Sequence, residues 1–111
     1  MFKYKTTSIC VICNNEYNID FLVCAHIKKR SKCTKNEMKN VNNVVPMCKF
    51  GCDELFERGY IVVLDGVVEV LKPNNTDTIN TYLEKIKGNI CNSYSEKNKL
   101  FFEWHYTHHN K

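Results

Sequence analysis

The sequence predicts one small domain of the α+β class, and three features indicate it. The chain has 111 residues, the length of a single domain. Short apolar runs typical of strands alternate with stretches of helical periodicity. Seven cysteines, four of them in two close pairs, indicate that a bound metal supplements the limited core of so short a chain. We therefore expect residues 1–111 to fold as one unit.

Two apolar runs in the first half of the chain predict a pair of strands. Residues 19–26 read Ile-Asp-Phe-Leu-Val-Cys-Ala-His, and residues 43–47 read Asn-Val-Val-Pro-Met. The basic stretch between them is expected to be a long loop, and loops of this length in compact domains are usually functional or disordered.

A short helix and a hairpin are expected next. Residues 52–58 place Leu55 and Phe56 on one side, and Gly59 is suited to end the helix. Residues 60–64 and 67–71 are apolar runs around Asp65-Gly66, a strong signal for a two-residue turn.

Two helices are expected in the C-terminal part. Helical spacing of Ile79, Tyr82, Leu83 and Ile86 predicts the first, which ends at Gly88. The last helix is expected to begin near residues 93–95. Its predicted apolar side contains Leu100, Phe101, Trp104 and His108.

The cysteine pairs indicate a structural zinc site. Cys10 and Cys13 form a CxxC pair, and Cys48 and Cys52 form a CxxxC pair, with 34 residues between the two pairs. Two such pairs suit a closed tetrahedral zinc site without an open position. A redox CxxC would need a thioredoxin-like βαβ context, which the pattern lacks. The other cysteines, Cys24, Cys33 and Cys91, are expected to be ordinary buried side chains.

Positive charge is concentrated in residues 28–39, which we call the basic segment. This segment has six basic residues against the single acid Glu37, although the whole chain carries a net charge of only +4. Such a patch can bind phosphates without reading sequence, whereas a solvated lysine-rich loop is the alternative. Its basic residues are Lys28, Lys29, Arg30, Lys32, Lys35 and Lys39.

The sequence gives no indication of a membrane protein or of export. No apolar run approaches the ~20 residues that span a bilayer, and the N-terminal residues lack a signal-peptide pattern. An odd number of cysteines also argues against a secreted disulfide scaffold. We expect an intracellular protein.

The order and spacing of these motifs resemble the HNH endonucleases, which have a zinc-pinned ββα-metal (His-Me finger) fold. The resemblance covers residues 10–61, and residues 62–111 would be a hairpin and helical extension. The residues that carry it are Cys10 to Cys13, Ala25-His26-Ile27, residues 42–48 and residues 51–61. The resemblance implies metal-dependent hydrolysis of DNA phosphodiester bonds.

The resemblance also implies roles for individual residues. His26 matches the general base that activates water, and Asn43 matches the asparagine that holds the loop and orients that histidine. Asp53 falls where the family usually has a histidine that binds the catalytic Mg²⁺ or Mn²⁺, and a carboxylate suits either ion. Glu57 shares the helix face of Asp53 and is a further candidate ligand. Phosphate contacts are expected from Lys28, Lys29, Arg30, Lys32 and Lys35.

Two other function classes stay open. One is a zinc-dependent nucleic-acid-binding module without cleavage, which the departures Ala25 and Asp53 favour. The other is a structural zinc domain for protein contacts. A monomer with one site would nick DNA, whereas a homodimer could cut both strands. At the C-terminus His105, His108 and His109 could bind a metal or touch DNA, but we expect His108 and His109 to be solvated helix-end residues.

Overall fold

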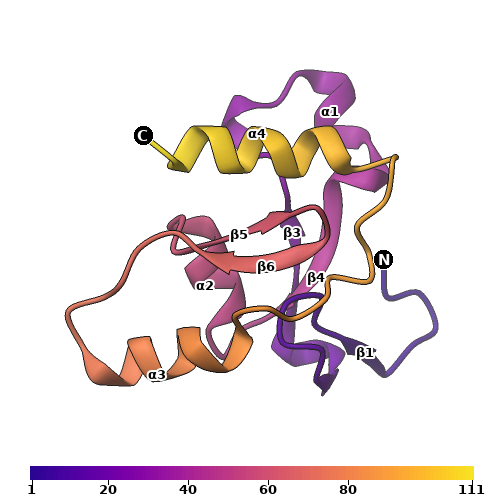
Figure 1. Ribbon diagram of the computed structural model, residues 1–111. Helices are drawn as coiled ribbons and strands as arrows, with labels where there is room; N and C mark the ends of the chain where they lie inside the picture. Colours follow the sequence, from indigo (N-terminus) through magenta and orange to yellow (C-terminus); the bar gives the residue numbers. More distant parts are fainter.

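Three antiparallel strand pairs and four α-helices make up the fold, which a computed structural model describes for residues 1–111 (Figure 1). This mixture confirms the predicted α+β class. None of the helices is both long enough and apolar enough to cross a membrane. The elements are β1 (Thr7–Ile9), β2 (Glu16–Asn18), β3 (Leu22–His26), α1 (Lys35–Lys39), β4 (Val44–Cys48), α2 (Cys52–Glu57), β5 (Ile61–Leu64), β6 (Val67–Val70), α3 (Asp77–Ile86) and α4 (Lys99–His109), with 3-10 turns at Ile19–Phe21, Arg30–Lys32 and Val41–Asn43.

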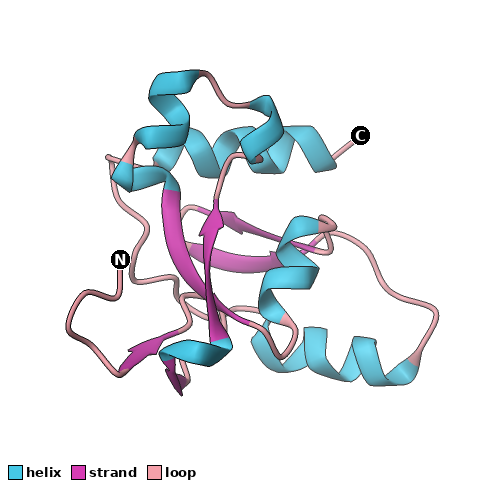
Figure 2. Cartoon of the chain, turned by 180° about the vertical axis from the view of Figure 1, so that it is seen from behind, coloured by secondary structure: helices cyan, strands magenta, loops and turns pink.

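The strand pair β3–β4 and the helix α2 form the centre of the fold (Figure 2). β3 and β4 pair antiparallel in a register that places Leu22 opposite Cys48 and His26 opposite Val44. The strand predicted over residues 19–26 is shorter than expected, because Asn18 accepts a hydrogen bond from the backbone N–H of Asp20 at 2.8 Å and starts a 3-10 turn.

The basic segment is not the long loop that the sequence predicts. It contains a 3-10 turn and the short helix α1. A capping box holds the start of α1: Thr34 accepts from the backbone N–H of Glu37 at 3.1 Å, and Glu37 accepts from that of Thr34 at 2.9 Å. The basic side chains therefore project from an ordered backbone.

Two strands that the sequence did not predict precede this centre. β1 and β2 pair from Thr7 opposite Asn18 to Ile9 opposite Glu16. The turn between them carries the first cysteine pair, and its backbone is closed by a 3.1 Å hydrogen bond from Cys10 N–H to Asn15 O. The short pair thus presents the two thiols of this turn to the rest of the domain.

The C-terminal half consists of the β5–β6 hairpin and the helices α3 and α4. α4 lies along the hairpin, whereas α3 lies apart from it on the opposite side (Figure 1). α4 begins at Lys99 rather than near residues 93–95, because the Asn98 side chain closes a turn there. The Oδ1 atom of Asn98 accepts from the backbone N–H of Ser95 at 2.9 Å, and its Nδ2 donates to Ser93 O at 2.7 Å.

The buried side of α4 differs from the predicted one. Phe102 and His105 are 1% and 3% exposed, whereas Leu100 is 74% exposed. His105 therefore belongs to the core and His108 does not. The prediction for the remaining cysteines also needs correction, because Cys91 is buried but Cys33 is only half-buried and Cys24 is exposed.

Candidate functional site

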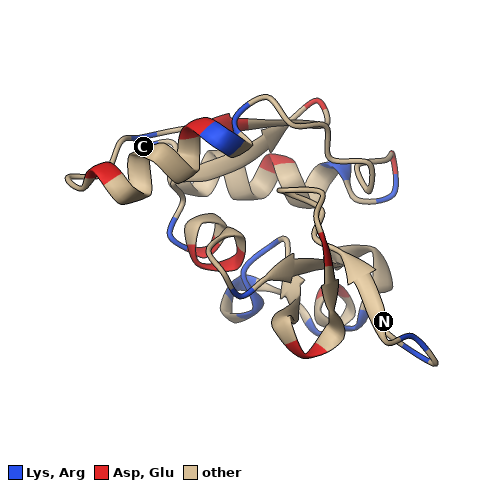
Figure 3. Ribbon diagram, turned by 90° about the horizontal axis from the view of Figure 1, so that it is seen from below, with Lys and Arg blue, Asp and Glu red and all other residues tan.

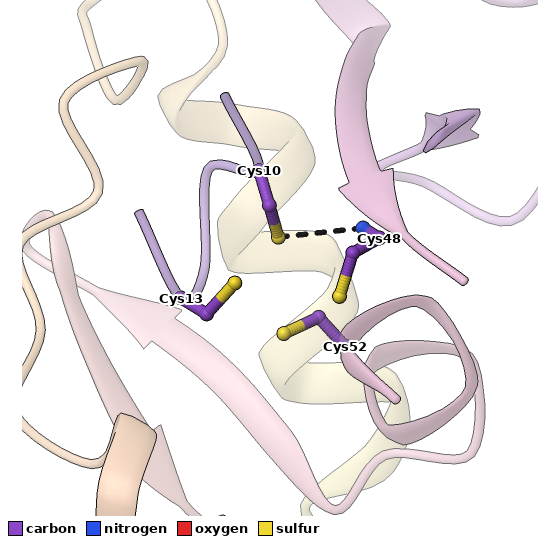
Figure 4. A group of neighbouring side chains, drawn as sticks. All are labelled: Cys10, Cys13, Cys48 and Cys52. Atoms are coloured by element: carbon purple, nitrogen blue, oxygen red, sulfur yellow. Dashed lines mark hydrogen bonds between the residues drawn. The ribbon is translucent and has the colours of Figure 1, made fainter. Parts of the chain in front are cut away.

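The two cysteine pairs meet in one cluster, which we call the thiol cluster (Figure 4). The four Sγ atoms, of Cys10, Cys13, Cys48 and Cys52, all lie within 4.8 Å of one another. A tetrahedral zinc ion with Zn–S bonds of ~2.3 Å would place its sulfurs ~3.8 Å apart. The spacing and the sulfur ligands therefore fit zinc, as the sequence predicted.

Hydrogen bonds connect the cysteines of the thiol cluster with one another and with α3. The backbone N–H of Cys48 donates to Cys10 Sγ at 3.3 Å, and the Tyr82 hydroxyl lies 3.1 Å from Cys52 Sγ. Hydrogen bonding to Cys48, together with burial, raises the pKa of Cys10 to about 12, whereas hydrogen bonds from Cys10 and Cys52 lower the pKa of Cys48. A bound dication would offset the repulsion among four thiolates and release the remaining protons.

Gly51, which lies within the second cysteine pair, makes room for a side chain of α3. A Cβ atom on Gly51 would lie only 3.0 Å from Cζ of Tyr82. Glycine at this position therefore lets the Tyr82 ring close over the thiol cluster.

A separate open pocket of about 490 Å³ lies between β3, α2 and the basic segment. His26 lines it from the end of β3, and Asp53 and Glu57 line it from α2. The His26 side chain makes no hydrogen bond within the chain. Burial, followed by the nearby charges of Glu57 and Glu54, raises the pKa of the Asp53 carboxyl. The pocket thus brings together the imidazole of His26, which makes no hydrogen bond, and the carboxylates of Asp53 and Glu57.

Comparison with known protein families gives a match to the HNH endonucleases over residues 10–64. This segment contains both cysteine pairs, β3, β4, α2 and the pocket residues. Residues 10–64 belong to the HNH endonuclease family. A search of curated proteins found no match to the chain.

Within residues 10–64, which we call the HNH segment, Asn43 is fully buried and holds the start of the basic segment in place through hydrogen bonds. Its Oδ1 accepts from the backbone N–H of Lys28 at 2.9 Å, and its backbone carbonyl accepts from Ile27 N–H at 2.8 Å. Its Nδ2 donates to Glu37 O at 3.3 Å and to Cys33 Sγ at 3.4 Å. Asn43 thereby fixes the backbone that directly follows His26.

Figure 3 marks the positions of the Lys and Arg residues along the backbone. The basic side chains of the HNH segment are not equally available to a ligand. Lys28 Nζ lies 2.9 Å from Glu37 Oε1 and over the Trp104 ring, so this ammonium is already engaged. Lys29 Nζ lies 3.5 Å from Glu57 Oε1 and lines the pocket with Arg30. Arg30 and Lys35 also line a second pocket, to which His26 contributes as well. Basic side chains therefore line both pockets that contain His26.

His105 of the C-terminal helix contacts the HNH segment directly, a role that the sequence did not predict. Its ring stacks on Phe56, with centroids 3.6 Å apart, and its Nε2–H donates to Phe56 O at 2.7 Å. Its Nδ1 is buried without a partner. Burial lowers the pKa of His105 to about 3, so the ring is neutral near pH 7.

This buried imidazole predicts a stability loss in mild acid. The pKa of His105 in the folded state lies below the unfolded value of 6.5. The contribution of the neutral ring to the free energy of unfolding is therefore complete above pH 6.5 and falls as the pH drops toward 3. His105→Gln keeps an N–H donor but does not titrate. Urea unfolding at pH 6.5 and pH 5.0 should show the stability gap between wild type and variant shrink by about 2 kcal/mol. An unchanged gap would contradict a neutral, buried His105.

Proposed function

We propose that this protein is a metal-dependent endonuclease that hydrolyses DNA phosphodiester bonds at the pocket of its HNH segment. The observation that supports this most strongly is the convergence of His26, Asp53 and Glu57 on one open pocket with Lys29 and Arg30 at its wall. The strands β3 and β4 with α2 would then constitute the ββα-metal unit of the family, and the thiol cluster would bind a structural zinc ion.

His26 is the proposed general base. A neutral imidazole accepts a proton near neutral pH, and the His26 ring is free of hydrogen bonds to other side chains or backbone groups. It would take the proton from the water that attacks the phosphorus atom. Asn43 would support this role by fixing the chain that follows His26 through its bonds to Lys28 and Ile27.

Asp53 is the proposed ligand of a catalytic Mg²⁺ or Mn²⁺, with Glu57 as a second candidate. Both carboxylates project from one face of α2 into the pocket, and hard oxygen donors suit these ions. Bound there, the cation would supply positive charge that stabilises the phosphate and the departing 3′ oxygen. Glu57 would have to exchange its ion pair with Lys29 for a cation contact.

The substrate would be held mainly through its phosphates. Lys29, Arg30, Lys32 and Lys35 are the proposed contacts, and Lys28 would contribute mainly by holding α1 through Glu37. Phosphate contacts carry no sequence information, so the binding that they provide is independent of sequence.

A nucleic-acid-binding module without cleavage is the second candidate function. The Lys29–Glu57 ion pair favours it, because this pair neutralises a carboxylate that could otherwise bind a cation. Ala25, which lines the pocket between Cys24 and His26, also offers no ligand atom on its side chain. The two functions differ in turnover, whereas both predict salt-dependent DNA binding.

A metal titration with Asp53→Asn tests the proposed catalytic site. Zinc-loaded wild type should cleave a labelled DNA duplex when Mg²⁺ or Mn²⁺ is added, and not in buffer without them. Asp53→Asn should need about 10 to 100-fold more metal, since it loses a charged ligand. Asp20→Asn, an exposed aspartate outside the pocket, serves as the matched control and should behave as wild type. Binding without cleavage by the wild type would favour the second candidate.

A further inference from the structure

The last turn of α4 lies against the wall of the proposed catalytic pocket. His105 stacks on Phe56, which lines the pocket, and His109 lies one helical turn further on, with its ring 4.6 Å from that of His105. A Cβ atom on Gly59 would collide with the His109 ring. Gly59 follows the pocket residue Glu57 by two positions, so the C-terminal end of α4 meets the C-terminal end of α2.

His108 extends this contact toward the basic segment. Its ring lies 4.8 Å from that of His109 and stacks on Trp104 at 4.5 Å. The Nζ atom of Lys28, the first residue of the basic segment, lies 5.6 Å from the centroid of the Trp104 ring on which His108 stacks, so this part of α4 packs beside the basic segment. Burial lowers the pKa of His108, the positive charges of Lys111, Lys29 and Lys32 lower it further, and the charge of Glu57 raises it.

This group carries more positive charge than the chain neutralises. The three ion pairs of the structure are Lys28–Glu37, Lys29–Glu57 and Arg58–Glu54, so neither Lys32 nor Lys111 has an acidic partner. Lys32 and Lys111 are therefore cations without an acidic partner, and such groups attract anions. The anion that the pocket is proposed to receive is a nucleic-acid backbone.

We propose that the C-terminal turn of α4, through His108 and Lys111, binds a DNA phosphate beside the pocket, on the same surface as Lys29 and Lys32. The inference rests on the proposed function, because it takes DNA as the substrate. It assigns to residues outside the HNH segment a direct part in substrate binding. A backbone strand would then pass from Lys35 and Arg30, across His26, to the end of α4.

DNA binding by the double variant His108→Gln/Lys111→Gln tests this inference. The probe is a labelled 20-base-pair duplex, measured by fluorescence anisotropy without Mg²⁺ or Mn²⁺ at several salt concentrations. The variant should bind about 10-fold more weakly, and the salt dependence of binding should fall by about one charge contact, that of Lys111. Lys85→Gln/Lys87→Gln removes exposed charge from the region of α3 and is the matched control; it should change affinity by less than about 2-fold.

The outcomes separate the inference from the function on which it rests. Equal weakening in the two double variants would overturn the inference, because only net charge would then matter. If the wild type cleaves the duplex on addition of Mg²⁺ while the test variant binds as tightly as wild type, the inference alone fails. A folded wild type that neither binds nor cleaves DNA would contradict both proposals.

Discussion

Replacement of Cys52 by serine should remove the bound zinc and unfold the domain. Cys52 is fully buried, and its sulfur lies in the thiol cluster under Tyr82. Zinc sites of this kind contribute on the order of 10 kcal/mol or more, which is as large as the whole stability of a small domain. Serine offers a far weaker ligand. Zinc content should fall from about one ion per chain to nearly none, and the cooperative thermal transition should disappear.

Cys24→Ser is the matched control for this prediction. Cys24 is exposed and lies outside the thiol cluster, so its replacement should leave zinc content and thermal unfolding unchanged. Chelation of zinc from the wild type should reproduce the behaviour of Cys52→Ser. A folded Cys52→Ser variant without zinc would show that the cluster does not hold the fold together.

His26→Ala should lower the rate of DNA cleavage by about 10² to 10⁴-fold, the contribution usual for a general base. The substitution removes an imidazole that makes no hydrogen bond in the chain, so the fold should be unaffected. The measurement is single-turnover cleavage of a labelled duplex, with enzyme in excess. Affinity for the duplex should change little, because the flanking lysines and Arg30 remain.

Added imidazole provides a further check on the role of His26. A small base that enters the open pocket should restore part of the rate of His26→Ala, and restoration should increase with pH as imidazole loses its proton. A variant that cleaves at the wild-type rate would exclude His26 as the base. A variant that has lost zinc or DNA binding would instead indicate a structural defect.

The parts of the fold with a local chemical signal could be predicted from the sequence. Asp65 and Gly66 both adopt positive φ, at 51° and 82°, as the two-residue turn of the β5–β6 hairpin requires. The spacing of Tyr82, Leu83 and Ile86 likewise marked α3. The α1 helix had such a signal too, in the capping box of Thr34 and Glu37, but the surrounding lysines made the stretch resemble a loop.

Features that depend on distant contacts could not be predicted in this way. β1 and β2 have three residues each and no apolar alternation, and the cysteine turn between them brings them together. The burial of His105 depends on Phe56, which lies 49 positions earlier in the chain. A histidine pattern on a helix fits a solvated face as well as a buried one, so only the packing of α4 distinguishes them.

In the candidate site, too, some features have a local signal in the sequence and others depend on contacts between distant residues. The cysteine spacing was sufficient to predict the thiol cluster, because ligand geometry restricts the sequence strongly. The assignment of His26, Asn43 and Asp53 depended on the order of family motifs, and their catalytic roles stay predictions. The ion pair of Lys29 with Glu57 and the approach of α4 to the pocket have no sequence signal, because they join residues far apart in the chain.

Relaxation of a supercoiled plasmid by the zinc-loaded wild-type protein would show whether the pocket of His26 and Asp53 is a nuclease site. The protein would be incubated with the plasmid in buffer alone, with Mg²⁺ and with Mn²⁺, and its zinc content and DNA binding would be measured on the same preparation. We expect nicked or linear DNA only where Mg²⁺ or Mn²⁺ is present. A plasmid that stays supercoiled with either metal, although the protein is folded, zinc-loaded and bound to it, would contradict the assignment of this pocket as a nuclease site.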